Sequence, residues 1–187
     1  MNQEIDRIFI INYFIKKYNY SDYLEIGIFH GVTFSFIECK NKDSVDIKKD
    51  PNCPFEIKYL CSSDKFFEKH ITKKYDIIFI DGNHESYQVD IDIVNSLKWL
   101  NENGTVILHD CNAPEAEGSG EGTVWKSISK FNCTNNGYTC HVVNVDHGCG
   151  IIRKGDQIKH NLSLEQAAMW SNKKLNLISV QEFNTLY

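Results

Sequence analysis

Two short apolar runs, DIIFI at 76–80 and TVILH at 105–109, constrain the fold of this chain more than any other feature. Both are nearly continuous in aliphatic residues, which is typical of strands buried on both faces of a sheet. Between the runs, apolar side chains recur at helical spacing at Val89, Ile93, Leu97 and Leu100. The pair Asn103-Gly104 then supplies a helix stop signal. A strand, a helix and a second strand at this spacing predict a right-handed βαβ unit of a parallel sheet.

The flanking sequence extends this unit into a single α/β domain that covers residues 1–187. Further strands are predicted at Tyr23–Ile26, Val45–Ile47 and Ile57–Cys61. Helical patterns are found in an N-terminal amphipathic helix at 1–20, in TVWKSISKF at 123–131, and in two short stretches of a tail at 162–187, LEQAAMW and VQEFNTLY. We expect a Rossmann-like, mostly parallel sheet with helices on both faces. The tail is expected to dock on the domain or on a second copy of the chain.

The C-terminal part of the sheet is expected to be antiparallel. Residues 139–146 and 148–155 are rich in apolar residues and are separated by a tight turn at His147-Gly148, which predicts a closing hairpin. Asp146 and His147 are expected at a solvated position in this turn.

Length and composition exclude several classes of protein. A chain of 187 residues can bury enough surface to fold without disulfides or a structural metal. The net charge is −5 and the 20 basic residues are scattered, so the footprint of a nucleic-acid-binding protein is missing. The sequence has neither an uncharged apolar run long enough to span a membrane nor a signal-peptide pattern. Seven cysteines without a C-x-x-C pair indicate reduced thiols and a cytoplasmic protein.

A glycine-containing turn follows the first predicted strand. Glu25, Gly27 and Gly31 form the pattern E-x-G-x-x-x-G where this strand ends and a helix begins. Glycines there allow the backbone to approach a nucleotide-like ligand closely, and Asp46, at the end of the next strand, can accept hydrogen bonds from both ribose hydroxyls. A purely structural turn has the same pattern. An NAD(P)-dependent oxidoreductase also stays open, although the dinucleotide fingerprint G-x-G-x-x-G is not met.

Titratable side chains gather after the two central strands. Asp81, His84 and Glu85 follow DIIFI, and His109 and Asp110 end the next strand. Because the carboxyl ends of parallel strands meet at one edge of a sheet, where α/β proteins bind their ligands, we expect these groups to converge. Carboxylates can hold a hard divalent cation and a histidine can accept a proton near neutral pH. The alternative is that His84 and His109 only cap strand ends.

The motifs together resemble one known family. E-x-G-x-x-x-G, the strand-end Asp46, FIDGNHESY and GTVILHD with a following GTVWK resemble the class I SAM-dependent methyltransferases, in particular the sugar and catechol O-methyltransferases. The resemblance covers about Tyr23 to Lys154. It implies the class I methyltransferase sheet, S-adenosyl-L-methionine (SAM) as cofactor, and transfer of its methyl group to a hydroxyl of a small acceptor, with a sugar or a nucleotide-sugar as the expected substrate.

The resemblance also implies roles for individual residues. Residues that match the cofactor site are Glu25, Gly27 and Gly31 at the methionine end, Asp46 at the ribose, Ser62, Ser63 and Asp64 around adenine, and Asp81. In the metal-dependent members, the acids at Asp81 and Asp110 bind Mg²⁺, and a histidine matching His84 is the general base, with Asp81 at the same catalytic centre.

One position departs from the metal-dependent members. They carry an Asp or an Asn where this chain has Cys111, and a thiol is a poor ligand for Mg²⁺. His109 is the candidate replacement, although imidazole suits softer divalent metals. We further expect the loop at 113–122 to close over the site, and the protein can form a homodimer. A non-catalytic methyltransferase-like binding subunit is a second alternative, but a scaffold has no use for titratable groups gathered at one edge.

Overall fold

The computed structural model describes residues 5–112, 122–134, 137–155 and 175–187. The predicted tail helix LEQAAMW lies outside the described residues, as does all of the predicted closing loop except Gly122. No described helix is both long and apolar enough to cross a membrane.

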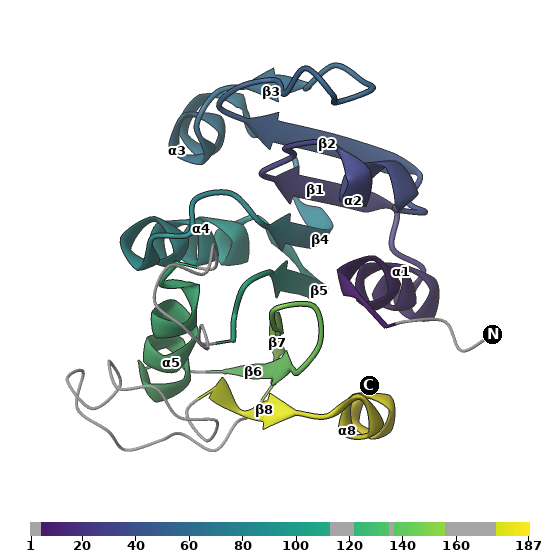
Figure 1. Ribbon diagram of the computed structural model, residues 1–187, viewed down its shortest axis with the longest axis vertical. Coiled ribbons are helices and arrows are strands. Elements are labelled where there is room, and N and C mark those ends of the chain that lie inside the picture. Colours follow the sequence, from purple (N-terminus) through teal and green to yellow (C-terminus); the bar gives the residue numbers. More distant parts are fainter. Residues whose placement is uncertain (1–4, 113–121, 135–136, 156–174) are drawn as a thin grey trace.

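One sheet runs through the described part of the chain (Figure 1). Its strands are β1 (Asp22–Ile26), β2 (Asn41–Asp46), β3 (Tyr59–Leu60), β4 (Tyr75–Ile80), β5 (Leu100–Leu108), β6 (Tyr138–Val143), β7 (Cys149–Lys154) and β8 (Leu177–Ile178). They lie in the order β3-β2-β1-β4-β5-β7-β6-β8. β1 to β5 are parallel, β7 is antiparallel to both β5 and β6, and β8 is parallel to β6. The mostly parallel sheet with a C-terminal antiparallel hairpin is therefore confirmed.

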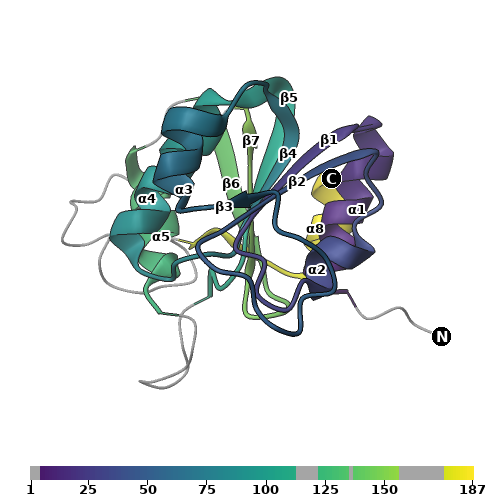
Figure 2. The same cartoon turned by 90° about the horizontal axis from the view of Figure 1, so that it is seen from above.

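Helices cover both faces of the sheet (Figure 2). They are α1 (Arg7–Tyr18), α2 (Val32–Phe36), α3 (Ser63–Lys65), which continues into the π-helical turn η1 (Phe66–His70), α4 (Ser86–Lys98), α5 (Val124–Thr134) and α8 (Val180–Leu186). Figure 2 shows α3, α4 and α5 on one face and α1, α2 and α8 on the other. This arrangement confirms the expected helices on both faces.

The two central strands carry the core, as their apolar runs predict. Along β4, Ile78 and Ile80 pack into the cluster under α4 and α5, whereas Ile77 and Phe79 pack into the cluster under α1 and α8. The alternation follows from the two-residue period of a strand. Both faces of β4 are therefore buried, which explains why its sequence is a continuous apolar run.

The helix before β5 ends earlier than the sequence predicts. α4 ends at Lys98, and the N–H of Trp99 bonds to the carbonyl groups of Asn95 and Ser96. Asn103-Gly104 is not the helix stop but lies inside β5, next to a register shift in the pairing with β4. Glycine is required there, because a Cβ on Gly104 would lie 2.7 Å from the carbonyl oxygen of Asp76.

Other boundaries also differ from the predicted ones. β2 begins at Asn41 rather than Val45, and β3 is reduced to Tyr59–Leu60. The short strand β8 was not predicted, since two residues carry no recognisable alternation.

Candidate functional site

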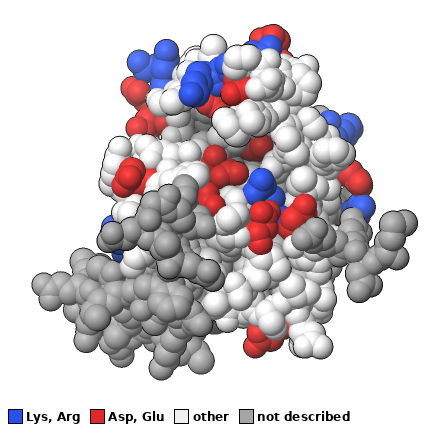
Figure 3. All heavy atoms as spheres, in the orientation of Figure 1, with Lys and Arg blue, Asp and Glu red and all other residues white. Residues whose placement is uncertain are grey.

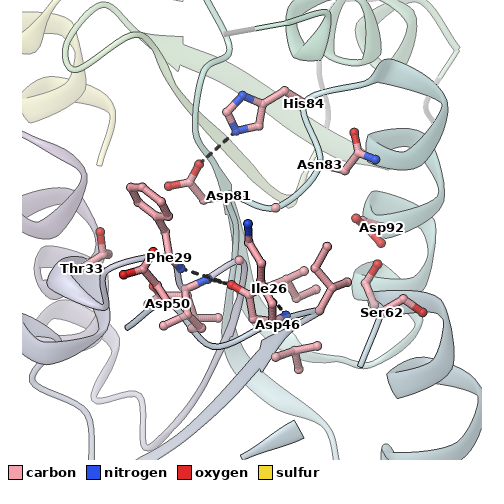
Figure 4. Close-up of a pocket in the computed structure, with 18 of the residues that line it drawn as sticks. Ile26, Phe29, Thr33, Asp46, Asp50, Ser62, Asp81, Asn83, His84 and Asp92 are labelled. Carbon is pink, nitrogen blue, oxygen red and sulfur yellow. Dashed lines mark hydrogen bonds and ion pairs between the residues drawn. The ribbon is translucent and has the colours of Figure 1, made fainter. Parts of the chain in front are cut away.

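A cavity of about 790 Å³ opens at the carboxyl ends of β1, β2 and β4. β1 lies between β2 and β4, so the strand order reverses here, which is where open α/β sheets bind ligands. Acidic side chains gather in the hollow on this face (Figure 3). The carboxylates that line the cavity are Glu25, Asp46, Asp50, Asp81 and Asp92. Figure 4 shows Thr33, Phe29 and Asp81 on one side of the cavity and Ser62 and Asp92 on the other.

The glycine turn is shaped by close contacts with the neighbouring strand. Gly27 has a φ of +88°, and a Cβ there would lie 2.0 Å from the carbonyl oxygen of Asp81. Gly31 has a φ of +75°, and a Cβ would lie 2.8 Å from the ring of Phe55. Both positions therefore need glycine for packing, and Gly27 also lines the cavity.

Asp46 anchors the glycine turn from the end of β2. Its Oδ2 accepts hydrogen bonds from the backbone N–H groups of Ile28 at 2.8 Å and Phe29 at 3.2 Å (Figure 4). Its Oδ1 accepts from the N–H of Lys48 at 3.2 Å. These hydrogen bonds fix the carboxylate at the cavity wall. There it can contact a ligand, as the predicted ribose role requires.

Glu25 is a buried carboxyl group that faces the cavity. It is 1% exposed and accepts a hydrogen bond on Oε2 from the hydroxyl of Tyr23. Its Oε1 has no hydrogen-bond partner among the described residues. Burial, strengthened by the charge of Asp81, raises the pKa of Glu25 to about 8. A cationic ligand group beside this carboxyl would stabilise its charged form.

Asp81, His84 and Asp110 form the acid–imidazole group that the sequence predicts. His84 Nε2 lies 3.3 Å from Asp110 Oδ2 and 3.7 Å from Asp81 Oδ1. Burial raises the pKa of Asp81, but hydrogen bonds with His109 and His84 outweigh this effect and keep the pKa well below its ordinary value. One ligand atom from each of the three residues lies within 4.8 Å of the others, so the group can hold a metal ion.

His109, the other predicted metal ligand, already contacts protein groups through both ring nitrogens. Its Nδ1 lies 3.1 Å from Asp110 Oδ1 and 3.5 Å from Asp81 Oδ1, and its Nε2 lies 2.5 Å from Arg7 Nη1. Burial lowers the pKa of His109, but hydrogen bonds with Asp110, Asp146 and Asp81 more than offset this and raise it.

The raised pKa and the Arg7 contact favour different protonation states of His109. A raised pKa favours the imidazolium, whereas the contact requires Nε2 to accept, because arginine can only donate. The Arg7 contact at 2.5 Å places the proton of His109 on Nδ1, where it is directed to Asp110 Oδ1 at 3.1 Å. Binding a metal through either ring nitrogen would break one of these contacts.

Two residues at the site were missed in the sequence. Arg7, the first residue of α1, lines the cavity and donates from Nε to Thr33 Oγ1 at 3.1 Å. Asp146 was expected to be solvated at the hairpin turn, but it accepts from the backbone N–H of Arg7 at 3.1 Å and from Arg7 Nη1 at 3.2 Å. No local signal marks these contacts, because 139 positions separate the partners.

The predicted adenine residues lie at the opposite end of the cavity. Ser62 caps the N-terminus of α3, and both Ser62 and Ser63 line the cavity. Asp64 is not among the lining residues and accepts a hydrogen bond from Gln88 Nε2 at 3.1 Å.

Gln88 and Asp92 on α4 line this end of the cavity and were also missed. Burial raises the pKa of Asp92 to about 6. The two residues are one helical turn apart and lie beside the apolar positions of α4. Polar residues next to a buried apolar stripe are the sequence feature that could have indicated their role.

Comparisons with known proteins support the fold and part of the sequence interpretation. Residues 55–111 match a family model described as a methyltransferase domain. No curated protein matches the sequence. An O-methyltransferase from Bacillus cereus in complex with SAH is similar in structure, with a TM-score of 0.60 and 11% identity over 82% of this chain and 84% of that chain.

Two further solved structures are similar in the same way. An SAH-bound methyltransferase from Podospora anserina has a TM-score of 0.60 and 16% identity over 80% of this chain and 78% of that chain. A proposed caffeoyl-CoA O-methyltransferase from Staphylococcus aureus has a TM-score of 0.60 and 19% identity over 82% of this chain and 86% of that chain. This chain therefore has the fold of these O-methyltransferases, as its sequence motifs predict, and residues 55–111 match the methyltransferase-domain model.

Proposed function

We propose that this chain is a SAM-dependent O-methyltransferase that acts on a hydroxyl group of a small acceptor. The observation that carries the proposal is the convergence, around one cavity, of the glycine turn, Asp46, Asp81 and His84, with Asp110 lying 3.3 Å from His84. A cavity of this size is in the range of sites that enclose a cofactor and a small substrate.

The polar groups along the cavity follow the order of groups in the cofactor. Ser62 and Asp92 stand at one end and offer acceptors for an adenine amino group. Asp46 lies between the two ends and can accept from ribose hydroxyls. Glu25 can pair with the ammonium of the amino-acid end. The cofactor supplies a methyl group that is already activated by a positively charged sulfur.

The residues at the other side of the cavity can remove a proton from the acceptor. His84 is positioned to accept the hydroxyl proton, and the carboxylates of Asp110 and Asp81 beside Nε2 would stabilise the resulting imidazolium. The glycine turn and Asp46 fix the position of the donor, so that much of the rate enhancement comes from alignment of the two reactants.

A divalent cation fits the same side chains. Asp81 and Asp110 provide carboxylate oxygens and His84 an imidazole nitrogen, a mixed set that suits Mn²⁺, Fe²⁺ or Zn²⁺ better than Mg²⁺. When bound, such an ion would lower the pKa of a coordinated hydroxyl group. His84 cannot serve as ligand and as base in the same step, so metal use and the base role of His84 are alternatives that an experiment must separate.

For the acceptor we propose a carbohydrate, following the sequence resemblance. The acid–imidazole side of the cavity offers polar partners for a polyhydroxylated substrate. The homodimer and the cytoplasmic location remain predictions from the sequence.

Calorimetry and a transfer assay test the proposal. We expect S-adenosylhomocysteine (SAH) to bind and NADH not to bind. Asp46→Ala should weaken SAH binding by about 10- to 100-fold, because hydrogen bonds to a charged group are lost and the glycine turn is released. Transfer of labelled methyl from SAM to sugars, nucleotide-sugars and catechols would identify the acceptor class. A wild-type protein that binds NADH but not SAH would instead support the oxidoreductase alternative.

A chelator decides between the two roles of His84. Activity that persists in EDTA and falls by about 100-fold or more in His84→Gln would support the general base. Activity that EDTA abolishes and that added Mn²⁺ or Mg²⁺ restores would support a metal centre. If His84→Gln keeps full activity with and without chelator, both assignments are wrong.

A further inference from the structure

The start of helix α1 places a cation at the cavity wall. Among the described residues that line the cavity, the lysine and arginine residues are Arg7 and Lys48. Lys48 follows Asp46 at the end of β2, whereas Arg7 donates to Thr33, which Figure 4 places at the opposite end from Ser62 and Asp92. Arg7 therefore marks the end of the cavity where the proposed cofactor carries its amino-acid group.

The guanidinium of Arg7 is held in place by the protein. Nε donates to Thr33, and the two N–H groups of Nη1 are engaged by His109 at 2.5 Å and Asp146 at 3.2 Å. The backbone N–H of the same residue bonds to Asp146 Oδ2. Three side-chain contacts, to Thr33, His109 and Asp146, pre-organise the guanidinium, so a ligand that binds it loses little additional entropy.

Part of this guanidinium has no protein partner. Arginine carries five N–H donors, of which Nε and Nη1 provide three. Nη2 has no hydrogen-bond partner among the described residues. Its two N–H groups are therefore available to a ligand. Nη2 can therefore donate a charge-assisted hydrogen bond to a carboxylate oxygen.

An acidic side chain lies nearby in the same cavity. Glu25 is buried, and its Oε1 has no recorded partner among the described residues. The charge of Arg7 is close enough to lower the pKa of Glu25 against the larger effect of burial. A guanidinium and a carboxyl group, each with unused hydrogen-bonding capacity, are complementary to a ligand group that carries both a carboxylate and an ammonium, because the ammonium favours the ionised form of Glu25.

We infer that Arg7 binds the α-carboxylate of the cofactor while Glu25 pairs with its α-ammonium, so that helix α1 forms part of the cofactor site. This inference rests on the proposed function, because SAM is the ligand with such an α-amino-acid end. Arg7 is then a binding residue that favours ligands with a complete amino-acid group. It also contacts His109.

The test compares ligands that differ only at this end. Binding of SAH, of its decarboxylated analogue and of 5′-methylthioadenosine, which lacks the amino acid, is measured by calorimetry in the wild type, Arg7→Gln and Arg7→Lys. Lys16→Gln is the matched control, because Lys16 is an exposed cation of the same helix that does not line this cavity.

We expect the wild type and Lys16→Gln to prefer SAH over its decarboxylated analogue by about 10- to 100-fold. Arg7→Gln should reduce that preference to about threefold or less while binding the decarboxylated analogue as the wild type does, and Arg7→Lys should restore part of the preference.

Three results would overturn the inference. One is a wild type that binds SAH and its decarboxylated analogue equally well, which needs no variant and is independent of folding. The second is an unchanged preference in Arg7→Gln. The third is an equal loss of affinity for both ligands in Arg7→Gln and Arg7→Lys, which would show that Arg7 only supports the fold. A wild type that binds none of the three ligands contradicts the proposed function itself.

Discussion

At the scale of single residues, the site depends on how closely the backbone of β1 approaches that of β4. Gly27 follows Ile26, and its missing side chain allows the turn to pack against the carbonyl group of Asp81. The same glycine lines the cavity, so a side chain at this position would disturb both the packing of the turn and the binding of a ligand. Loss of this glycine is therefore expected to affect both the fold and the site.

Gly27→Ala should destabilise the protein by about 3 kcal/mol or more, because strain from the left-handed backbone adds to a direct clash. Gly137→Ala is the matched control: its φ of +75° is also left-handed, but no atom of the described residues lies within 4 Å of the added Cβ. It should cost only about 1–2 kcal/mol. Urea unfolding measures both variants, and equal losses would show that the contact with Asp81 does not matter.

At the scale of elements, two helices from opposite ends of the chain pack on one face of the sheet. Phe183 of α8 is 0% exposed and its ring contacts those of Tyr13 and Phe14 in α1. A capping box between Ser179 and Glu182 begins α8. Because α1 also carries Arg7 into the cavity, α8 supports the site from a distance. The sequence suggested that this part of the tail docks on the domain or on a second copy, and in this structure it packs against α1.

Phe183→Ala should lower the free energy of unfolding by about 3–5 kcal/mol, since it leaves a cavity between α8 and α1. Leu186→Ala in the same helix should change it by less than about 0.5 kcal/mol, because Leu186 is 55% exposed. Denaturant unfolding provides both values. Similar small losses in the two variants would mean that α8 is not part of the folded core.

At the scale of the whole molecule, buried acids make stability depend on pH in two separate ranges. Glu25 has a pKa of about 8 in the folded protein, against an ordinary value of 4.5. The folded state therefore keeps a proton that the unfolded chain releases, and stability falls as pH rises between these values. Asp146 acts in the opposite sense, because its contacts with His109 and Arg7 outweigh burial and lower its pKa to about 2. Its contribution is lost only as pH falls below about 4.

Glu25→Gln should flatten the pH dependence of stability above pH 5. Between pH 5 and pH 8, the wild type should lose up to about 4 kcal/mol more than the variant, since each pKa unit corresponds to about 1.4 kcal/mol. Unfolding is followed in chelator without ligand, and Glu38→Gln, a change at an exposed acid, is the control. Identical slopes in the wild type and Glu25→Gln would show that Glu25 is ionised in the folded protein.

Much of the fold could be predicted because its signals are local. The apolar runs of β4 and β5 and the hairpin of β6 and β7 are visible as short patterns of side-chain type. The end of α4 was predicted at the wrong residue. Gly104 is needed where β5 passes close to the backbone of β4, and the sequence alone cannot distinguish such a glycine from a helix stop.

Local sequence patterns predict which residues lie at the ends of strands. Asp46, Asp81 and Asp110 follow apolar runs, and parallel strands bring their carboxyl ends to one edge, so local patterns sufficed to gather them. The contact of Arg7 and Asp146 at this site, and the hydrogen bonds from the glycine turn to Asp46, depend on the three-dimensional arrangement of the strands. Periodicity and turn chemistry act over a few neighbouring residues, whereas contacts across most of the chain depend on strand order and on the direction of each side chain, which no local pattern encodes.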